Sequence, residues 1–179
     1  MQAENILHFW FDELTEKQHF AKDAALDETI RIRFGATLEA AARCDLYAWR
    51  SAPEGRLAEI IVLDQFSRHV YRDTPRSFAQ DALALSLAQE LVASGQDSAL
   101  STAQRRFAYM PYMHSESVLI HAQAVHLFAL PGLEEAMDFE QRHQSIIARF
   151  GRYPHRNAVL GRRSTVEEIA FLNEPGSSF

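Results

Sequence analysis

The stretch LAEIIVLDQFSRHVY, at positions 57–71, decides the fold of this chain. Leu57, Ile60 and Ile61 form an apolar stripe at helical spacing. The same stripe continues with two charged residues and an aromatic one, Asp64, Arg68 and Tyr71. A second stripe is apolar throughout and consists of Val62, Leu63, Phe66 and Val70. A helix that is apolar over most of its circumference belongs in the centre of a domain. We therefore predict a central helix from Pro53 to Val70.

Asp64 and Arg68 lie about one turn apart at positions of this helix that should face the core. With restricted access to water, an aspartate and an arginine at this spacing should form an ion pair. The pair has two interpretations: a structural ion pair that fixes the register of the helix, or the floor of a ligand pocket. Both stay open, because structural networks pair buried charges as readily as functional sites do.

The rest of the chain predicts further helices. Apolar residues at helical spacing indicate helices over residues 3–13, 28–44, 78–94, 101–110, 115–130, 133–150 and 166–173, and a short helix ends at Gly161. No segment shows the period-2 alternation that is typical of strands. The sequence therefore predicts an all-α protein with about eight helices.

Residues with strong preferences for helix ends mark these boundaries. Predicted starts are Asp27, Pro53, Ser115 and the capping-box pairs Ser101–Gln104 and Ser164–Glu167. Left-handed glycines are expected after helices at Gly95, Gly151 and Gly161. Pro111 should stop the helix that precedes it.

Composition and charge are those of an ordinary globular domain. The 179 residues, 47% hydrophobic and 23% charged, suffice for one domain spanning residues 1–179 and leave its oligomeric state open. The net charge of −6 argues against binding to nucleic acid or to an anionic membrane surface. No segment reaches the roughly 18 consecutive apolar residues of a membrane span. The single Cys44 and the absence of a basic signal sequence predict a cytoplasmic protein.

His143 lies on the apolar stripe of the helix predicted over residues 133–150. The other members of that stripe are Ala136, Phe139, Ile146 or Ile147, and Phe150. The histidine should therefore face the core or a cleft. A hydrogen-bonded core histidine and an acid–base catalyst both fit this position.

The segment HSES places His114, Ser115 and Glu116 at a predicted helix start, where free backbone N–H groups can receive an anion. Gln123 follows seven residues after Glu116 and should share its face. The chain has no GxSxG turn, which argues against a serine hydrolase of that type. The spacing from His121 to His126 does not suit a shared metal, so a metal site would need side chains from different helices.

The segment FGRYPHRNAVLGRRST is the densest functional signal. Residues 149–163, which we call the arginine turn, hold five arginines and no acidic residue. The rigid Tyr-Pro unit should present Arg152, His155, Arg156 and Asn157, a set that suits a carboxylate or a phosphate. In the alternative interpretation, these arginines pair with acids of other helices, for which Asp64, Glu116 and Glu168 are candidates.

Four separated motifs occur in order: DQFSR (64–68), PYMHSES (111–117), HxxII (143–147) and GRYPHRNAVLGRRST (151–165). With them the chain resembles a bacterial family of uncharacterised proteins, a domain of unknown function grouped with tetratricopeptide-like helical proteins. The resemblance covers nearly the whole chain and implies an antiparallel array of helix hairpins, but no substrate or catalytic residue. The family pattern often has Asn after the arginine of DQFxR, where this chain has His69.

Two functions fit these observations. The first is a pocket for a small anion, carboxylate or phosphate, in which Arg68, Arg152 and Arg156 hold the charge. His143 or His155 would then act as acid or base, oriented by Asp64 or Glu116. Further ligand contacts are expected from His114, Gln123 and Asn157.

The second is a helical scaffold that binds a peptide or protein in a concave groove, with Asn157 and the arginines holding a terminal carboxylate. A small enclosed volume with converging ionisable groups would favour the first function, and a long open groove the second. Neither interpretation requires a cofactor or a metal.

Overall fold

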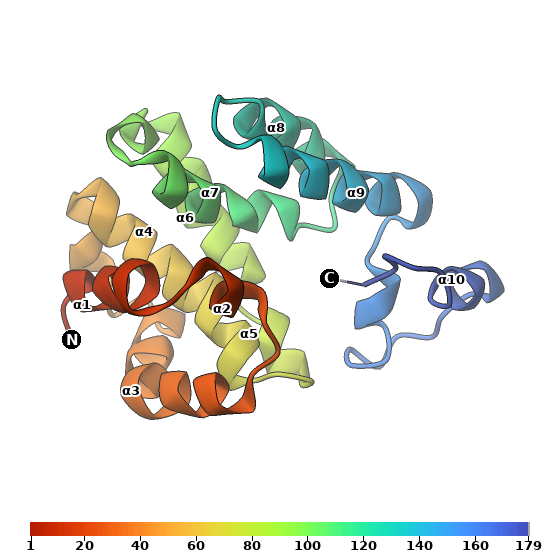
Figure 1. Ribbon diagram of the computed structural model, residues 1–179, viewed down its shortest axis with the longest axis horizontal. Coiled ribbons are helices and arrows are strands. Elements are labelled where there is room, and N and C mark those ends of the chain that lie inside the picture. Colours follow the sequence, from red (N-terminus) through yellow and green to blue (C-terminus); the bar gives the residue numbers. More distant parts are fainter. Residues whose placement is uncertain (179) are drawn as a thin grey trace.

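The structure, a computed structural model, describes residues 1–178 and contains helices but no strand in that range (Figure 1). The α-helices are α1 (Ala3–His8), α2 (Glu16–Phe20), α3 (Ala24–Ala42), α4 (Pro53–Ile61), α5 (Ser67–Val70), α6 (Asp81–Ala93), α7 (Thr102–Met113), α8 (Val118–Phe128), α9 (Glu134–Phe150) and α10 (Val166–Phe171). The all-α prediction is confirmed. Within the described residues, no helix combines the length and apolarity that would let it cross a membrane.

Six shorter helical segments complete the path of the chain. Two are π-helical, η1 (Phe9–Glu13) and η3 (Val62–Phe66). Four are 3₁₀-helical: η2 (Tyr47–Ser51), η4 (Pro75–Phe78), η5 (Gln96–Ala99) and η6 (Pro154–Arg156). The predicted central helix is therefore one continuous helical rod, formed by α4, η3 and α5, with a π-helical turn in its middle.

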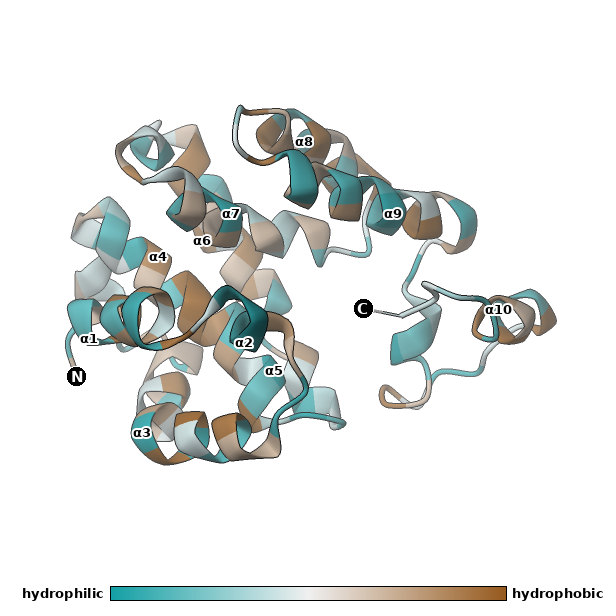
Figure 2. Ribbon diagram, in the orientation of Figure 1, coloured by the Kyte–Doolittle hydropathy of each residue, from teal (hydrophilic) through white to brown (hydrophobic). Residues whose placement is uncertain are grey.

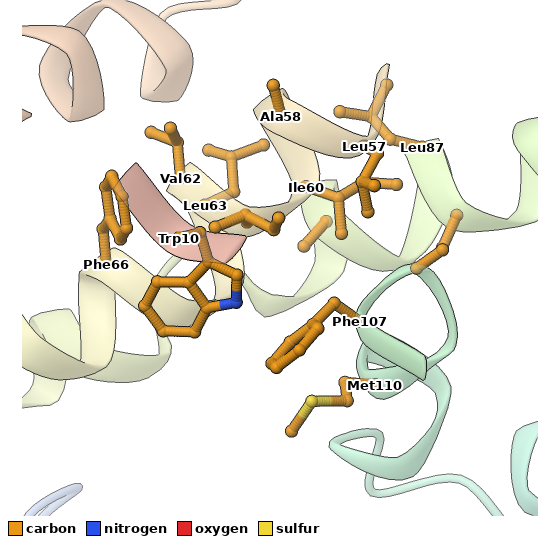
Figure 3. Close-up of a cluster of buried hydrophobic side chains, with 14 of the residues drawn as sticks. Trp10, Leu57, Ala58, Ile60, Val62, Leu63, Phe66, Leu87, Phe107 and Met110 are labelled. Carbon is orange, nitrogen blue, oxygen red and sulfur yellow. The ribbon is translucent and has the colours of Figure 1, made fainter. Parts of the chain in front are cut away.

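This rod lies in the main hydrophobic core. The apolar residues of both predicted stripes are buried, except for the partly buried Val70, and Figure 3 shows several of them around Trp10 and Phe107. Helices α1 and α3 pack against the rod, as do α6 and α7. In Figure 2 the ribbons of α3, α4 and α9 each carry both hydrophilic and hydrophobic residues.

Helices α6, α7, α8 and α9 pack each against the next. The chain then turns at Gly151, which has the left-handed φ of 68° expected after a helix, and continues through the rest of the arginine turn into α10. A second, smaller core forms there around Ile146, Ile147, Tyr153 and Phe171. The tetratricopeptide-like pattern implied by the resemblance stays a prediction.

Three predicted boundaries are wrong by a few residues. Asp23 caps α3, accepting hydrogen bonds from the backbone N–H groups of Ala25 and Leu26 at 2.9 and 3.2 Å, which leaves Asp27 for side-chain contacts. Ser117, and not Ser115, precedes α8. The last capping box joins Thr165 to Glu168, one residue beyond the predicted pair.

Pro111 does not stop α7, which continues to Met113. Proline removes one backbone hydrogen bond and disfavours the helical interior. However, every residue from Phe107 to Met113 is buried, so the packing of this segment outweighs the local preference. The predicted Ser101–Gln104 capping box and the N-terminal Pro53 are confirmed.

Two helical glycines should respond in opposite ways to the same substitution. A Cβ at Gly55 would lie 2.1 Å from the backbone oxygen of Trp49, whereas a Cβ at Gly35 meets no atom within 4 Å. We expect Gly55→Ala to destabilise the protein by about 1–3 kcal/mol through overpacking. Gly35→Ala should stabilise it by about 0.5–1 kcal/mol through helix propensity. Urea denaturation measures both, and a shift of both midpoints in one direction would contradict the packing described.

Candidate functional site

A cavity of about 610 Å³ lies between α2, α5, α7, α9 and the arginine turn. Its volume is in the range typical of small-molecule sites, about 300–1,000 Å³. Its ionisable lining residues are Arg68, Arg72, Arg106, Arg142, Arg156, His19, His69, His114, His143, His155 and Asp73. This central cavity is thus lined by five arginines, five histidines and one acid.

Four charged side chains of alternating sign form a chain of ion pairs next to the cavity. Arg68 Nη1 lies 3.1 Å from Asp64 Oδ1, and Arg68 also makes a bidentate pair with Asp81 at 2.9 and 3.1 Å. Arg156 Nη1 reaches the same Asp81 at 3.2 Å. We call Asp64, Arg68, Asp81 and Arg156 the four-charge network. The predicted Asp64–Arg68 ion pair is confirmed, and Arg68 lines the cavity.

The network keeps Asp64 ionised although the residue is fully buried. Burial alone would raise the pKa of its carboxyl group, but the charge of Arg68 and the contact with His114 lower it well below its ordinary value. Burial by itself would lower the pKa of the Arg68 guanidinium. The charges of Asp64 and Asp81 outweigh this effect and raise the pKa above its ordinary value.

Arg156 is the least well neutralised member of the network. It is 6% exposed and makes one long ion pair, to a carboxylate that already binds Arg68. Within residues 1–178 its Nε has no hydrogen-bond partner. Burial and the nearby charge of Arg68 lower the pKa of this guanidinium. A buried, incompletely paired cation of this kind favours the binding of an anion.

His114 completes the surroundings of Asp64. Its Nδ1 lies 2.7 Å from Asp64 Oδ1, so Nδ1–H donates to the carboxylate and Nε2 keeps its lone pair. Burial, followed by the charge of Arg68, lowers the pKa of this imidazole. His114 also borders a second cavity, of about 400 Å³, whose lining includes Phe78, Asp81 and Arg156. Phe78, His114 and Arg156 therefore form a wall that the two cavities share.

His143 and His155 line the central cavity, and both lie close to Tyr153. Their rings lie 5.6 and 5.5 Å from the Tyr153 ring. Burial lowers the pKa of His143 to about 3 and that of His155 to about 4. His143 Nδ1 donates to the backbone oxygen of Phe139 at 2.7 Å. Both imidazoles are therefore neutral at pH 7.

The arginine turn divides into a structural part and a part that faces the cavity. Arg152 pairs with Glu168 at 2.6 and 2.8 Å, and Arg162 pairs with Glu116 at 2.6 and 2.9 Å. The interpretation in which arginines of the turn pair with acids from other parts of the chain is therefore correct for Arg152 and Arg162. Arg156 lines the cavity, and its acidic partner is Asp81, which the sequence analysis did not consider.

Three predicted ligand residues do not line the central cavity. Arg152 lies outside it, with Glu168. Asn157 is buried behind it and bonds to Ser164 and Arg162. Gln123 is exposed on α8.

Glu116 is also outside the central cavity, although it borders the second one. It accepts hydrogen bonds from Arg162 and from the backbone N–H of Tyr153, and so holds the arginine turn to the start of α8. No group of three or more metal-binding side chains occurs in the part of the chain that the structure describes.

Local sequence patterns did not identify the residues that connect distant segments. Asp81 joins Arg68, 13 residues before it, to Arg156, 75 residues after it. His114 and Asp64 are 50 residues apart. Helical periodicity places a side chain on a face but not opposite a particular partner, so no sequence signal identifies these pairs.

Removal of the Asp64 carboxylate should destabilise the protein strongly. Asp64→Ala leaves Arg68 with one acidic partner, Asp81, and His114 without its acceptor, and we expect a loss of about 3–5 kcal/mol in the free energy of unfolding. Glu28 forms an exposed pair with Arg31, so Glu28→Ala should cost at most about 1 kcal/mol. Chemical denaturation compares the two variants. Equal midpoints would show that Asp64 is not a buried ionic partner.

The neutral histidines should make the protein sensitive to mild acid. The folded-state pKa of His143, about 3, lies below its unfolded value of 6.5, so the unfolded chain binds the proton first as pH falls. Stability should therefore drop between pH 6.5 and pH 4, by about 1.4 kcal/mol per pH unit for each such histidine. In denaturation series at several pH values, His143→Gln should show a shallower slope than the wild type. An unchanged slope would mean that His143 is not a buried neutral imidazole.

Comparison with known proteins agrees with the fold. Residues 6–176 match the family described as bacterial protein of unknown function (DUF924). The solved structure of a protein of unknown function from Agrobacterium tumefaciens superposes with a TM-score of 0.89 and 38% sequence identity, covering 96% of each chain. No curated protein matches the chain. Because the family match covers nearly its whole length, the chain belongs to the bacterial family DUF924, whose function is unknown.

Proposed function

We propose that the central cavity binds a small organic anion, with a carboxylate or phosphate group held at Arg156 and Arg68. The observation that carries this proposal is the incomplete pairing of the buried Arg156, whose Nε has no hydrogen-bond partner within the described residues. An anion at this position would accept charge-assisted hydrogen bonds from a guanidinium that is already desolvated.

Two further contacts prepare this place for an anion. The guanidinium of Arg156 lies 4.6 Å and that of Arg68 5.6 Å from the centre of the Phe78 ring. One aromatic ring therefore contacts both cations. Arg142 adds a positive charge that has no acidic partner in residues 1–178, whereas the one acid of the lining, Asp73, pairs with Lys22 at 3.1 Å.

The remaining lining favours a ligand with an apolar body. Its apolar side chains include Phe20, Phe78, Met110, Met113, Phe128, Ala136, Phe139 and Val159. Methionine and aromatic side chains give apolar contact without a fixed polar geometry. His143 and His155 line the same cavity, and their low pKa values make them poor proton donors at pH 7.

The size of the cavity favours this function over the helical scaffold. A volume of about 610 Å³ accommodates a small molecule, and ionisable groups from five separate segments converge on it. Binding of a peptide carboxylate by the same arginines is the alternative outcome of the test below.

We also propose a cytoplasmic location, since the single cysteine, Cys44, is an exposed free thiol.

A thermal-shift screen with carboxylates, phosphate monoesters and short peptides tests the proposal. At least one organic anion should raise the midpoint of unfolding with concentration, because it binds the native state. Arg156→Gln should weaken that ligand at least about tenfold through loss of a charged hydrogen bond.

Arg152→Gln is the matched control, because Arg152 belongs to the same turn but pairs with Glu168 outside the cavity. It should leave the affinity unchanged. The proposal is wrong if no anion shifts the wild type, or if the folded Arg156 variant responds as the Arg152 variant does. A response to peptides alone would support the scaffold.

A further inference from the structure

We propose that the protein is a hydrolase in which His114, oriented by Asp64, activates a water molecule toward the acyl carbon of an anionic carboxylic ester. The inference rests on the proposed function, since the anionic group of this ester would be the one held by Arg156. It assigns His114 as the catalytic base and Asp64 as its positioning residue.

The first observation is the geometry of the His114–Asp64 pair. Nδ1 of the imidazole donates to Oδ1 of the carboxylate at 2.7 Å, and this fixes the tautomer in which Nε2 can accept a proton. Asp64 cannot rotate freely, because Arg68 and the side-chain amide of Gln65 also bind its oxygens. A carboxylate held in this way orients the imidazole and stabilises the imidazolium that forms when Nε2 takes a proton.

The second observation is the place of His114 in the wall that both cavities share. Within the described residues no hydrogen bond reaches its Nε2, so this nitrogen is the one left for a ligand or water. Arg156 lines the same two cavities. The group that would hold the anion and the group that would accept a proton therefore border the same space.

The third observation concerns the backbone beneath the pair. Asp64 lies in η3, the π-helical turn that interrupts the central rod. Such turns are rare, and they occur frequently at functional sites. Here every residue of the turn, from Val62 to Phe66, is buried. This feature is independent of the charges around Asp64.

His143 is less suited to the same role. Its Nδ1 donates to a backbone oxygen, which does not stabilise an imidazolium as a carboxylate does. Burial also lowers its pKa to about 3.

The proposed reaction is a hydrolysis with water as the co-substrate. Nε2 of His114 takes a proton from water while the water oxygen bonds to the acyl carbon, and the carbonyl electron pair moves to its oxygen. Arg68 supplies positive charge beside this oxyanion. When the intermediate collapses, the bond to the alcohol oxygen breaks, and the proton on His114 passes to that alkoxide. The products are a carboxylic acid and an alcohol.

The charges that face His114 set its behaviour with pH. They are Asp64 in η3, Arg68 in α5 and Asp81 in α6, and His143 in α9 lies close enough to interact with it. Burial and Arg68 lower the pKa of His114 below 6.5, so the base is neutral at pH 7. The rate should therefore be constant from about pH 7 upward and should fall in acid.

The test uses mono-4-nitrophenyl succinate as an anionic ester, 4-nitrophenyl propionate as its neutral counterpart, and succinate as the unreactive ligand. The wild type should bind succinate and hydrolyse the anionic ester faster than the neutral one. His114→Asn can still donate an amide N–H to Asp64 but lacks Nε2. This variant should bind succinate normally and hydrolyse the anionic ester at least about 100-fold more slowly.

Two further variants complete the design. His126→Asn changes an exposed histidine of α8 and should hydrolyse the ester at the wild-type rate. Asp64→Asn can donate to Nδ1 and so places the proton on Nε2, which should lower kcat strongly with KM nearly unchanged. A structural role alone would not produce this separation of kcat from KM.

The outcomes distinguish the two proposals. If the wild type fails to bind succinate and every other anion of the screen, the anion site is wrong and the hydrolase proposal falls with it. If succinate binds but the anionic ester is not hydrolysed, or if His114→Asn keeps the wild-type rate, the anion site stands and the role of His114 is overturned.

Discussion

The carboxylate of Asp64 is buried in the middle of the protein, and much of the polar architecture follows from keeping its charge neutralised. Arg68 and His114 neutralise and bind it directly. Arg68 also pairs with Asp81, and this ion pair holds the first turn of α6 against the central rod. Asp81 also binds Arg156, which attaches the arginine turn at the far end of the chain. One buried acid therefore connects segments that span more than half of the sequence.

Structural and ligand-binding interpretations of such a network are not exclusive. The pairs of Arg152 with Glu168 and of Arg162 with Glu116 hold the arginine turn in place. Because these pairs are well made, the turn can present Arg156 in an incompletely paired state without losing its conformation. Burial of the Arg156 charge costs free energy, and the rigid surroundings tolerate this cost. A bound anion would lower it.

Local patterns in the sequence predicted the helices, the central position of the rod and the buried Asp64–Arg68 pair, because these depend on spacing along one helix. These patterns gave wrong predictions where contacts between distant parts of the chain determine the local structure. Pro111 stays helical because its segment is packed in the core, and Asp27 binds His69 and Arg72 instead of capping a helix. The candidate site was predicted in part for the same reason: Asp81 and the pairing of His114 with Asp64 arise from contacts between distant helices, which periodicity does not specify.

The central claim is that Arg156 is held ready for an anion, whereas Arg152 and Arg162 of the same turn are already paired with carboxylates. Proton–nitrogen NMR spectra of the arginine Nε–H groups, recorded during titration with an anion that stabilises the protein, test this claim most directly. The Arg156 signal should shift with saturation, because its Nε has no hydrogen-bond partner within residues 1–178, whereas the Arg152 signal should stay in place, because its Nε already donates to Glu168 at 2.6 Å. A signal of Arg156 that is unchanged at saturation would contradict the account.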